Sequence, residues 1–237
     1  MRTVTFLLIG AVLAPTGLRG QDPGDAPHRS VSIVLGMGAA LNGPASGLVD
    51  QLREAGYDER SPCFIFCSGS TSHPTEAPPE VAVSVAAHLR VSRPLIVAGG
   101  LSRAALGGST GYRQEGFDWI FSHWSTSTAW VGAFWSAYPG VRVGGGPAVF
   151  RMSDDGIDEK HEVSKLGLMG EAGVEYPSNR RFFVDLAVRI HAVPSEDVVY
   201  TSRASGNVVT LRPNWTHVQV LVGFGIRLDR KSDKSGR

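Results

Sequence analysis

Apolar residues recur at every second position over long stretches of this chain, and this period restricts the fold more than any other feature. The pattern is clearest in 215–228, where large apolar residues alternate with residues such as Gln219, Gly223 and Gly225. Successive side chains of a β-strand point to opposite faces. The run therefore predicts a strand with one bulky apolar face and one small or polar face.

Eight stretches share this alternation, and clusters of Gly, Pro, Asn, Asp and Ser, which favour turns, separate them. The sequence does not decide which face of 126–137 is the bulky one, because Trp130 and Phe134 lie on one face and Val131 and Trp135 on the other. The predicted strands are 30–41, 80–91, 94–106, 126–137, 141–153, 163–176, 181–193 and 215–228.

The connections between these strands alternate in length. Segments 91–94, 138–141 and 177–180 are short enough for tight turns. The long connections are 42–79, 107–125, 154–162 and 194–214. This order predicts an all-β fold, an eight-stranded antiparallel up-and-down β-barrel with the long loops at one end. In the first long loop, Ala45–Tyr57 has apolar residues at helical spacing and predicts a short amphipathic helix.

The volume of the bulky faces decides which way they point. Side chains just fill the interior of an eight-stranded barrel, so eight faces of large aliphatic residues would overfill it. We therefore expect a transmembrane barrel whose bulky faces contact lipid. The alternative is a soluble lipocalin-like barrel that binds an apolar ligand and turns these faces inward. The predicted lipid-facing residues on the last two strands are Val184, Leu186, Val188, Val218, Val220, Val222, Phe224, Ile226 and Leu228.

The opposite faces carry glycines and charged residues, and we expect them to line the lumen. Charges in a narrow interior are costly unless they are paired, so ion pairs are expected to plug the lumen or to leave it very narrow. A small polar pore or a proton path through His88, His191 and His217 is the alternative. The predicted network consists of Arg90, Lys165, Glu171, Glu175, Asp185, Arg189 and Arg227.

The first residues are typical of a secretory signal, with a positive start, the apolar run Val4–Ala14 and small residues near Gly20. That run is shorter than the roughly 20 residues that a spanning helix needs. We expect residues 1–20 to be a cleaved signal peptide, 21–29 a periplasmic segment, 30–228 the barrel and 229–237 a basic tail.

The signal, the eight alternating strands and the alternating loop lengths together resemble the eight-stranded outer-membrane β-barrel family of OmpA, OmpX and OmpW type. The resemblance covers residues 30–228 and implies a place in the bacterial outer membrane, among its lipid and lipopolysaccharide, after insertion by the barrel-assembly machinery. The closing strand of that family carries an assembly signal, and Gly223, Ile226 and Leu228 match its positions. Here the last position is leucine where the family usually has an aromatic residue, and a tail follows the strand.

Composition and motifs give little support to other functions. With 23 Lys+Arg and 22 Asp+Glu the formal net charge is +1, so no overall field attracts nucleic acid. The sequence has no phosphate loop, dinucleotide fingerprint or zinc signature, and we expect no cofactor, metal site or catalytic residue. We expect a monomeric, non-enzymatic protein that acts in envelope stability or through its surface loops. A lipid-modifying enzyme is the third alternative, because His123 and Ser125 resemble the pair of outer-membrane lipid A deacylases.

Three further features belong to the loops and strand ends. Cys63 and Cys67 are expected to form a disulfide in an oxidising compartment. An acidic segment is expected to be solvated, since it lacks the spacing of a calcium loop; it contains Asp154, Asp155, Asp158 and Glu159. Aromatic residues expected near the membrane interfaces are Tyr138, Tyr176, Phe182 and Trp215.

Overall fold

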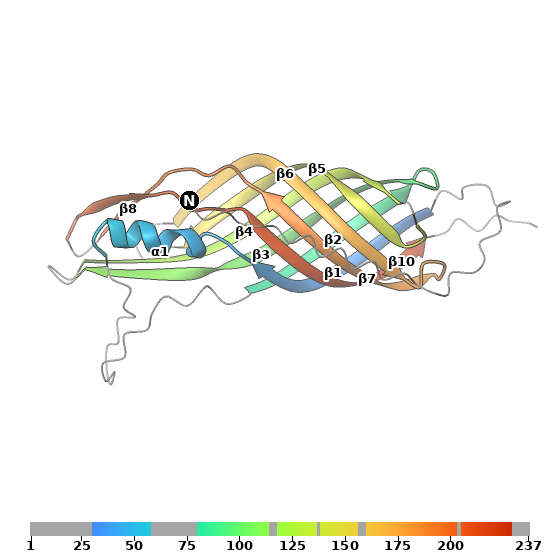
Figure 1. The fold of residues 1–237 in the computed structure, drawn as a ribbon, viewed down its shortest axis with the longest axis horizontal. Coiled ribbons are helices and arrows are strands. Elements are labelled where there is room, and N and C mark those ends of the chain that lie inside the picture. Colours follow the sequence, from blue (N-terminus) through green and yellow to red (C-terminus); the bar gives the residue numbers. More distant parts are fainter. Residues whose placement is uncertain are drawn as a thin grey trace, which may run out of the picture.

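Eight antiparallel strands close into a single barrel (Figure 1). The computed structural model describes residues 30–57, 80–113, 118–136, 138–155, 160–202 and 205–228. Around the barrel the strands follow the order β1, β10, β7, β6, β5, β4, β3, β2. Each neighbouring pair is antiparallel, and β1 pairs with both β2 and β10, so the sheet has no open edge where it closes. The predicted fold class is confirmed.

The barrel strands are β1 (Ser30–Leu41), β2 (Glu80–Arg90), β3 (Leu95–Arg113), β4 (Asp118–Trp135), β5 (Val141–Asp155), β6 (Lys160–Tyr176), β7 (Phe182–Ala192) and β10 (His217–Leu228). The remaining elements are the helix α1 (Ala45–Glu54) and the short strands β8 (Val198–Thr201) and β9 (Val208–Leu211). No described helix is long and apolar enough to cross a membrane.

Two of the segments predicted to be long loops contain strands, so these two predictions are wrong. Segment 107–125 is mostly strand, because β3 and β4 continue as a hairpin as far as Arg113 and Asp118 after a register shift between Ala105 and Gly108. Segment 194–214 contains β8 and β9, which pair only with each other. The helix predicted in the first long loop is present as α1.

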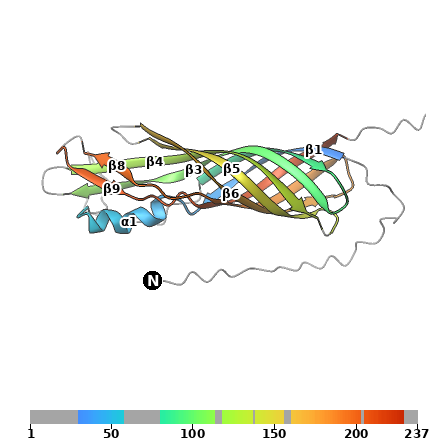
Figure 2. The ribbon, with the colours of Figure 1, turned by 90° about the horizontal axis from the view of Figure 1, so that it is seen from above.

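These extra elements gather at the long-loop end and form a head beyond the barrel: α1, β8, β9 and the extended β3–β4 hairpin (Figure 2). The apolar side of α1 is buried against the hairpin, with Leu48 and Leu52 almost inaccessible to solvent. Gly111 lets the helix come close, because a Cβ there would lie 3.2 Å from Leu52. Trp215 is buried at 4% exposure, so its predicted interfacial position is wrong.

The bulky faces point outward. Leu186, Val222 and Phe224 are 52%, 47% and 74% exposed, and Val218 and Ile226 are half-buried on the same outer wall. Inward positions of the same strands are buried, including Asp185 and Leu221. The segment 126–137 of β4, whose faces the sequence did not decide, also turns one face inward and the other outward. Trp130 and Phe134 point inward, whereas Val131 and Trp135 are exposed.

Glycines make room for the large inward side chains. A Cβ at Gly173 would lie 2.6 Å from the guanidinium of Arg142, and one at Gly100 would lie 2.8 Å from the indole of Trp130. A Cβ at Gly225 would lie 2.1 Å from Cζ of Phe183. The inner wall therefore alternates bare backbone with large side chains, which explains the inward glycines of these strands.

Candidate functional site

The lumen between the short turns and mid-barrel holds a layer of buried charges centred on Arg142. Its Nη1 and Nη2 donate to the two carboxylate oxygens of Asp185, at 2.5 and 2.9 Å. Its Nε donates to Oε1 of Glu171 at 2.8 Å. The first residues of β5 therefore supply a cation that joins a carboxylate from β6 to one from β7. Such a two-pronged contact uses the planar fork that distinguishes arginine from lysine.

A second arginine and a second carboxylate extend this layer. Arg189 donates from Nε and Nη2 to Oε2 of Glu171, at 2.9 and 2.7 Å. Glu175 accepts from Nη2 of Arg227 at 2.5 Å and lies 3.7 Å from Nδ1 of His88. We name Arg142, Glu171, Glu175, Asp185, Arg189 and Arg227 the lumen ion layer.

Five of the seven residues predicted for the network lie in this layer, and two do not. Lys165 lies farther toward the head, where its Nζ is 2.5 Å from Oε2 of Glu196. Arg90 lies at the rim, where it donates to the backbone oxygen of Arg93 at 2.8 Å and interacts electrostatically with Glu175 and Arg227 of the layer. The sequence prediction missed Arg142, although its position between the outward Val141 and Val143 marks it as an inward residue.

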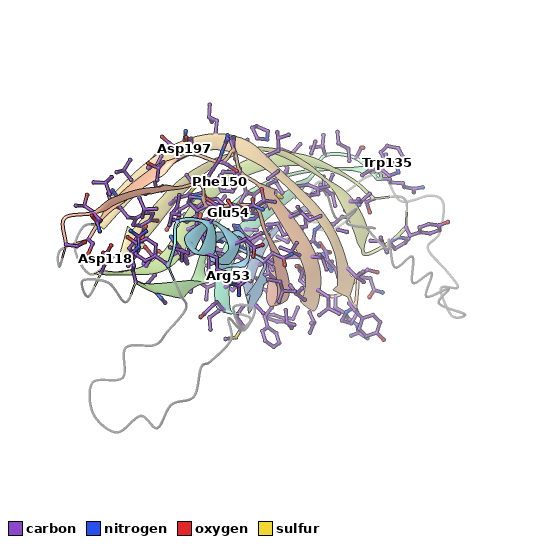
Figure 3. The ribbon with its side chains drawn as sticks, turned by 60° about the vertical axis from the view of Figure 1, so that its left-hand side comes forward. Arg53, Glu54, Asp118, Trp135, Phe150 and Asp197 are labelled. Carbon is purple, nitrogen blue, oxygen red and sulfur yellow. The ribbon has the colours of Figure 1, made fainter. Side chains whose placement is uncertain are left out.

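Aromatic rings and two histidines are buried inside the barrel on the head side of the ion layer. The guanidinium of Arg189 lies over the face of the Trp130 ring, 4.8 Å from its centroid. His191 and His217 lie 4.6 Å apart between ring centroids, and Phe150 lies 5.4 Å from His191. Figure 3 places Phe150 between Trp135, near the short turns, and Asp118 in the head. Trp130, Phe150, His191 and His217 are all buried.

Asp154, near the head end of β5, connects the barrel wall to the β8–β9 hairpin through hydrogen bonds. It accepts a hydrogen bond from Ser122 at 2.5 Å and another from Tyr200. Burial raises the pKa of Asp154 above its ordinary value, although these two donors oppose the rise. Burial and the adjacent Asp154 also raise the pKa of Tyr200. The phenol of Tyr200 therefore stays protonated and donates its hydrogen bond to Asp154.

Asp118 forms the second polar contact of the head. Tyr57 donates to its Oδ2 at 2.8 Å, and the side-chain amide of Asn207 donates to the same oxygen at 3.1 Å. Burial opposes ionisation, but hydrogen bonds from neighbouring side chains, these two among them, hold the pKa of Asp118 below its ordinary value. Burial and then Asp118 raise the pKa of Tyr57 to about 12. One carboxylate thus joins the end of the helical segment, the hairpin and the β8–β9 connection.

The other predicted features lie elsewhere. His123 is exposed on the outer wall and Ser125 is half-buried on the same face. Cys63 and Cys67, the proposed signal peptide and the basic tail lie outside the described residues. Among the described residues no group of three His, Cys, Asp or Glu could hold a metal ion. Asp154 is buried and bonded, so the expectation of a fully solvated acidic loop is wrong for this residue.

The proposed assembly-signal residues occupy the turn-end half of β10. Gly223 is inward beside Val34, because a Cβ there would lie 2.9 Å from a methyl group of that valine. Ile226 and Leu228 lie on the outer wall and pair with Ile33 and Val31 of β1. This strand closes the barrel, so the three residues lie at its final junction.

Comparisons with known proteins give matches among solved structures alone. No protein-family model matches the chain. No curated protein matches it either. A major outer membrane protein of Thermus thermophilus is similar at 14% identity and a TM-score of 0.48, over 84% of this chain and 99% of that one. OprG from Pseudomonas aeruginosa has 12% identity and a TM-score of 0.46, over 86% and 99% of the two chains. Ail of Yersinia pestis has 12% identity and a TM-score of 0.41, over 86% and 100%.

Proposed function

We propose that this protein is a non-enzymatic β-barrel of the bacterial outer membrane, with a lumen closed to solutes and a head presented at the cell surface. One observation carries the proposal: the part of the outer wall near the short turns is apolar around the closed sheet, while buried ion pairs lie inside. In water this wall would be a large exposed apolar surface, which soluble monomers rarely tolerate. In lipid it is matched to its solvent.

The direction of the valine-rich faces disfavours the alternative of a soluble carrier. Such a barrel would hold its apolar ligand against inward valines, but Val184, Val220 and Phe224 are exposed on the outer wall. The enzyme alternative is also disfavoured. His123 and Ser125 lie on the outer face of β4, whereas the nearby Asp154 points inward and is bonded to Ser122 and Tyr200.

The buried layers inside the barrel support the proposal of a closed lumen. An ion that passed through would have to separate Arg142 from its carboxylates and then displace Trp130 and the two histidines above it. Separating a buried ion pair is costly. We infer that the barrel is a rigid support, that outer-membrane lipid and lipopolysaccharide surround its belt, and that it works as a monomer. The barrel-assembly machinery would insert it, with Gly223, Ile226 and Leu228 as the signal.

Two measurements on the purified full-length protein test this proposal. A folded membrane barrel resists unfolding by dodecyl sulfate until it is heated. We therefore expect the protein, refolded in detergent, to migrate differently on a gel before and after boiling. In planar lipid bilayers we expect no steady ion conductance. A soluble, monomeric folded protein in detergent-free buffer would contradict the membrane assignment, and steady open channels would contradict the closed lumen.

A further inference from the structure

Four polar atoms on neighbouring side chains inside the barrel are buried and have no hydrogen-bond partner within the described residues. They are Nη1 of Arg189, Nε1 of Trp130, Oε1 of Gln219 and Nε2 of His191. All four residues are almost inaccessible to solvent. Nearly all buried polar atoms of folded proteins bond to protein or to ordered water, because an unpaired buried donor or acceptor costs free energy. The four atoms therefore indicate a molecule bound between them.

These residues come from both sides of the barrel and meet in the lumen on the head side of the ion layer. Arg189 and Gln219 are paired directly across β7 and β10. The Trp130 ring reaches them from β4 and lies 4.8 Å from the Arg189 guanidinium. His191 follows Arg189 on the same face of β7, and its Nδ1 lies 3.4 Å from Oγ1 of Thr128 on β4. The unpaired atoms thus belong to one cluster.

The hydrogen bonds of His217 fix the orientation of the Gln219 amide. Nδ1 of His217 lies 2.9 Å from the backbone oxygen of Trp215, so this nitrogen carries a proton and donates it. In a neutral ring the other nitrogen is then an acceptor, and it receives the NH₂ group of Gln219 at 3.2 Å. The carbonyl oxygen Oε1 of Gln219 is therefore left as an acceptor inside the lumen.

The chemistry of the four atoms selects a small neutral molecule that both donates and accepts. Arg189 and Trp130 offer N–H donors, Gln219 offers an oxygen acceptor, and Nε2 of His191 can do either, according to its tautomer. The ion layer holds equal numbers of arginines and carboxylates, so it leaves no surplus charge for an ion to balance. Water meets these requirements, since it donates two hydrogen bonds and accepts two.

The neighbouring strands carry small side chains at this level. Ala40 of β1 pairs with Gln219, and Ser102 of β3 pairs with Thr128; both small residues are buried. Neither brings a bulky group that would compete for space beside the polar atoms. A buried water needs a polar site with two to four partners, and the cluster offers four.

We propose that the lumen binds ordered water between Arg189, Trp130 and Gln219, with His191 as a fourth partner. This water connects two groups of side chains, because Arg189 belongs to the ion layer and Gln219 is bonded to His217. The lumen is then held by a hydrogen-bonded column that includes solvent. The inference goes beyond the proposed function and requires only the barrel interior, whatever surrounds the outer wall.

The test measures contact between this water and the indole N–H proton of Trp130 in the full-length protein, refolded in deuterated detergent. Nuclear Overhauser spectra record the cross-peak between this proton and water, and Trp130→Phe assigns the indole signal by its absence. Direct contact with a long-lived water gives cross-peaks of opposite sign in the laboratory and rotating frames, whereas proton exchange gives the same sign in both. The indole of Trp135, exposed on the outer wall, is the control within the same spectra.

We expect a direct-contact cross-peak for Trp130 and none for Trp135. Gln219→Leu removes one partner of the water and should weaken the cross-peak about fivefold, the effect of losing about one hydrogen bond. Thr128→Val is the matched control, since it replaces a buried polar residue of the same level and removes a hydroxyl proton that would otherwise relay the signal. This variant should keep the cross-peak.

The absence of a direct-contact cross-peak in the wild type would overturn the proposal, as would its disappearance in Thr128→Val or an unchanged cross-peak in Gln219→Leu. In crystals that contain bromide, an anomalous peak beside Nη1 of Arg189 would assign the site to an anion and overturn it as well. If Gln219→Leu fails to refold, the wild-type spectra and the bromide crystals decide. Heat-modified migration of a wild type that lacks the cross-peak would refute the water site alone, whereas absence of that migration would refute the proposed function.

Discussion

Arg142 lies at the centre of the lumen ion layer, and its surroundings explain how the charge can be buried. The donors Nε, Nη1 and Nη2 all meet carboxylate oxygens, of Glu171 and Asp185. Glu171 in turn accepts from Arg189, so its two oxygens serve two arginines. Asp185 in turn needs Arg142 to stay ionised in the lumen, because removal of Arg142 would leave this carboxylate without its principal partner.

Replacing Arg142 with Met should therefore be strongly destabilising. The change leaves Asp185 ionised and unpaired in the lumen, and the loss of one partner of a buried pair costs about 3–5 kcal/mol. The free energy of unfolding by guanidinium chloride, measured on protein refolded in lipid vesicles, gives this value. Arg151→Met is the matched control, since Arg151 pairs with Glu162 on the exposed outer wall and such pairs contribute at most about 1 kcal/mol. Equal losses in the two variants would contradict the burial argument.

Asp118 provides a prediction that depends on pH. Its pKa lies below the ordinary value in the folded state, so its contribution to stability is present above about pH 4 and is lost as the pH falls through the folded pKa. Asp118→Asn should remove this dependence and weaken the acceptor that holds Tyr57 and Asn207. A hydrogen bond to a charged group contributes about 1.5–3 kcal/mol.

Hydrogen exchange of the amides in α1 and β9 tests this at pH values from 3 to 7. We expect exchange about tenfold faster in Asp118→Asn than in the wild type near neutral pH, and a smaller difference at the acid end. Asp50→Asn, an exposed position on α1, serves as the control and should leave exchange unchanged. Unchanged exchange in Asp118→Asn would show that the carboxylate does not hold the head together.

At the level of the strands, Gly100 on the inner wall should tolerate a side chain far less than Gly170 on the outer wall. A Cβ at Gly100 would lie 2.5 Å from the backbone oxygen of Val85 and 2.8 Å from the Trp130 ring, so a side chain there forces neighbours apart. Overpacking of this kind costs about 1–3 kcal/mol. Gly170 on the outer wall is the control, because its nearest contact would be 3.9 Å away.

We expect Gly100→Ala to lower the free energy of unfolding in detergent by an amount in that range. Gly170→Ala should leave it nearly unchanged or raise it slightly, since alanine reduces the freedom of the unfolded chain. If both variants unfold at the wild-type denaturant concentration, the lumen is looser than the contacts of Trp130 imply.

The strand order and the two faces of most strands could be predicted because both depend on a period of two in the sequence. The number of barrel strands, the outward valines of β7 and β10 and the place of Arg189 and Glu171 on the inner wall follow from that period. A resemblance to known barrels was consistent with this interpretation, but the alternation itself located the strands.

The head could not be predicted in the same way, because its strands lack the composition of the barrel strands. Residues 107–113 read Gly-Gly-Ser-Thr-Gly-Tyr-Arg, which favours a loop, and only pairing with β4 and packing against α1 make this segment a strand. The strands β8 and β9 left a weak signal, two valine pairs on either side of Ser205, Gly206 and Asn207. The face of 126–137 remained ambiguous because space at Gly100 lets Trp130 turn inward.

On the scale of the whole molecule, the outer wall changes character along the barrel. The wall is apolar from the short turns up to Leu101 on β3 and Val149 on β5, and the next outward residues on these strands are Arg103 and Arg151. Asp154 follows Arg151 on β5 and so lies beyond this boundary. Figure 3 shows Asp118 farther out, in the head. The proposed membrane therefore covers the part of the barrel near the short turns, while the β3–β4 hairpin carries the head out of it.

The depth of a charged substitution within this belt should determine its cost. Val222 lies near the middle of β10 and Leu228 at its end, and both are exposed on the outer wall. If lipid surrounds the wall, Val222→Arg should lower the free energy of unfolding in lipid vesicles by about 2–4 kcal/mol, whereas Leu228→Arg, close to the headgroups, should cost about 1 kcal/mol or less. In water an exposed arginine at either position would be tolerated, so a soluble barrel predicts little or no loss in both variants. Reversible unfolding of the two variants in vesicles of one lipid composition measures the difference directly. Equal stability would argue that the apolar wall meets something other than a bilayer, even if the barrel itself remains closed.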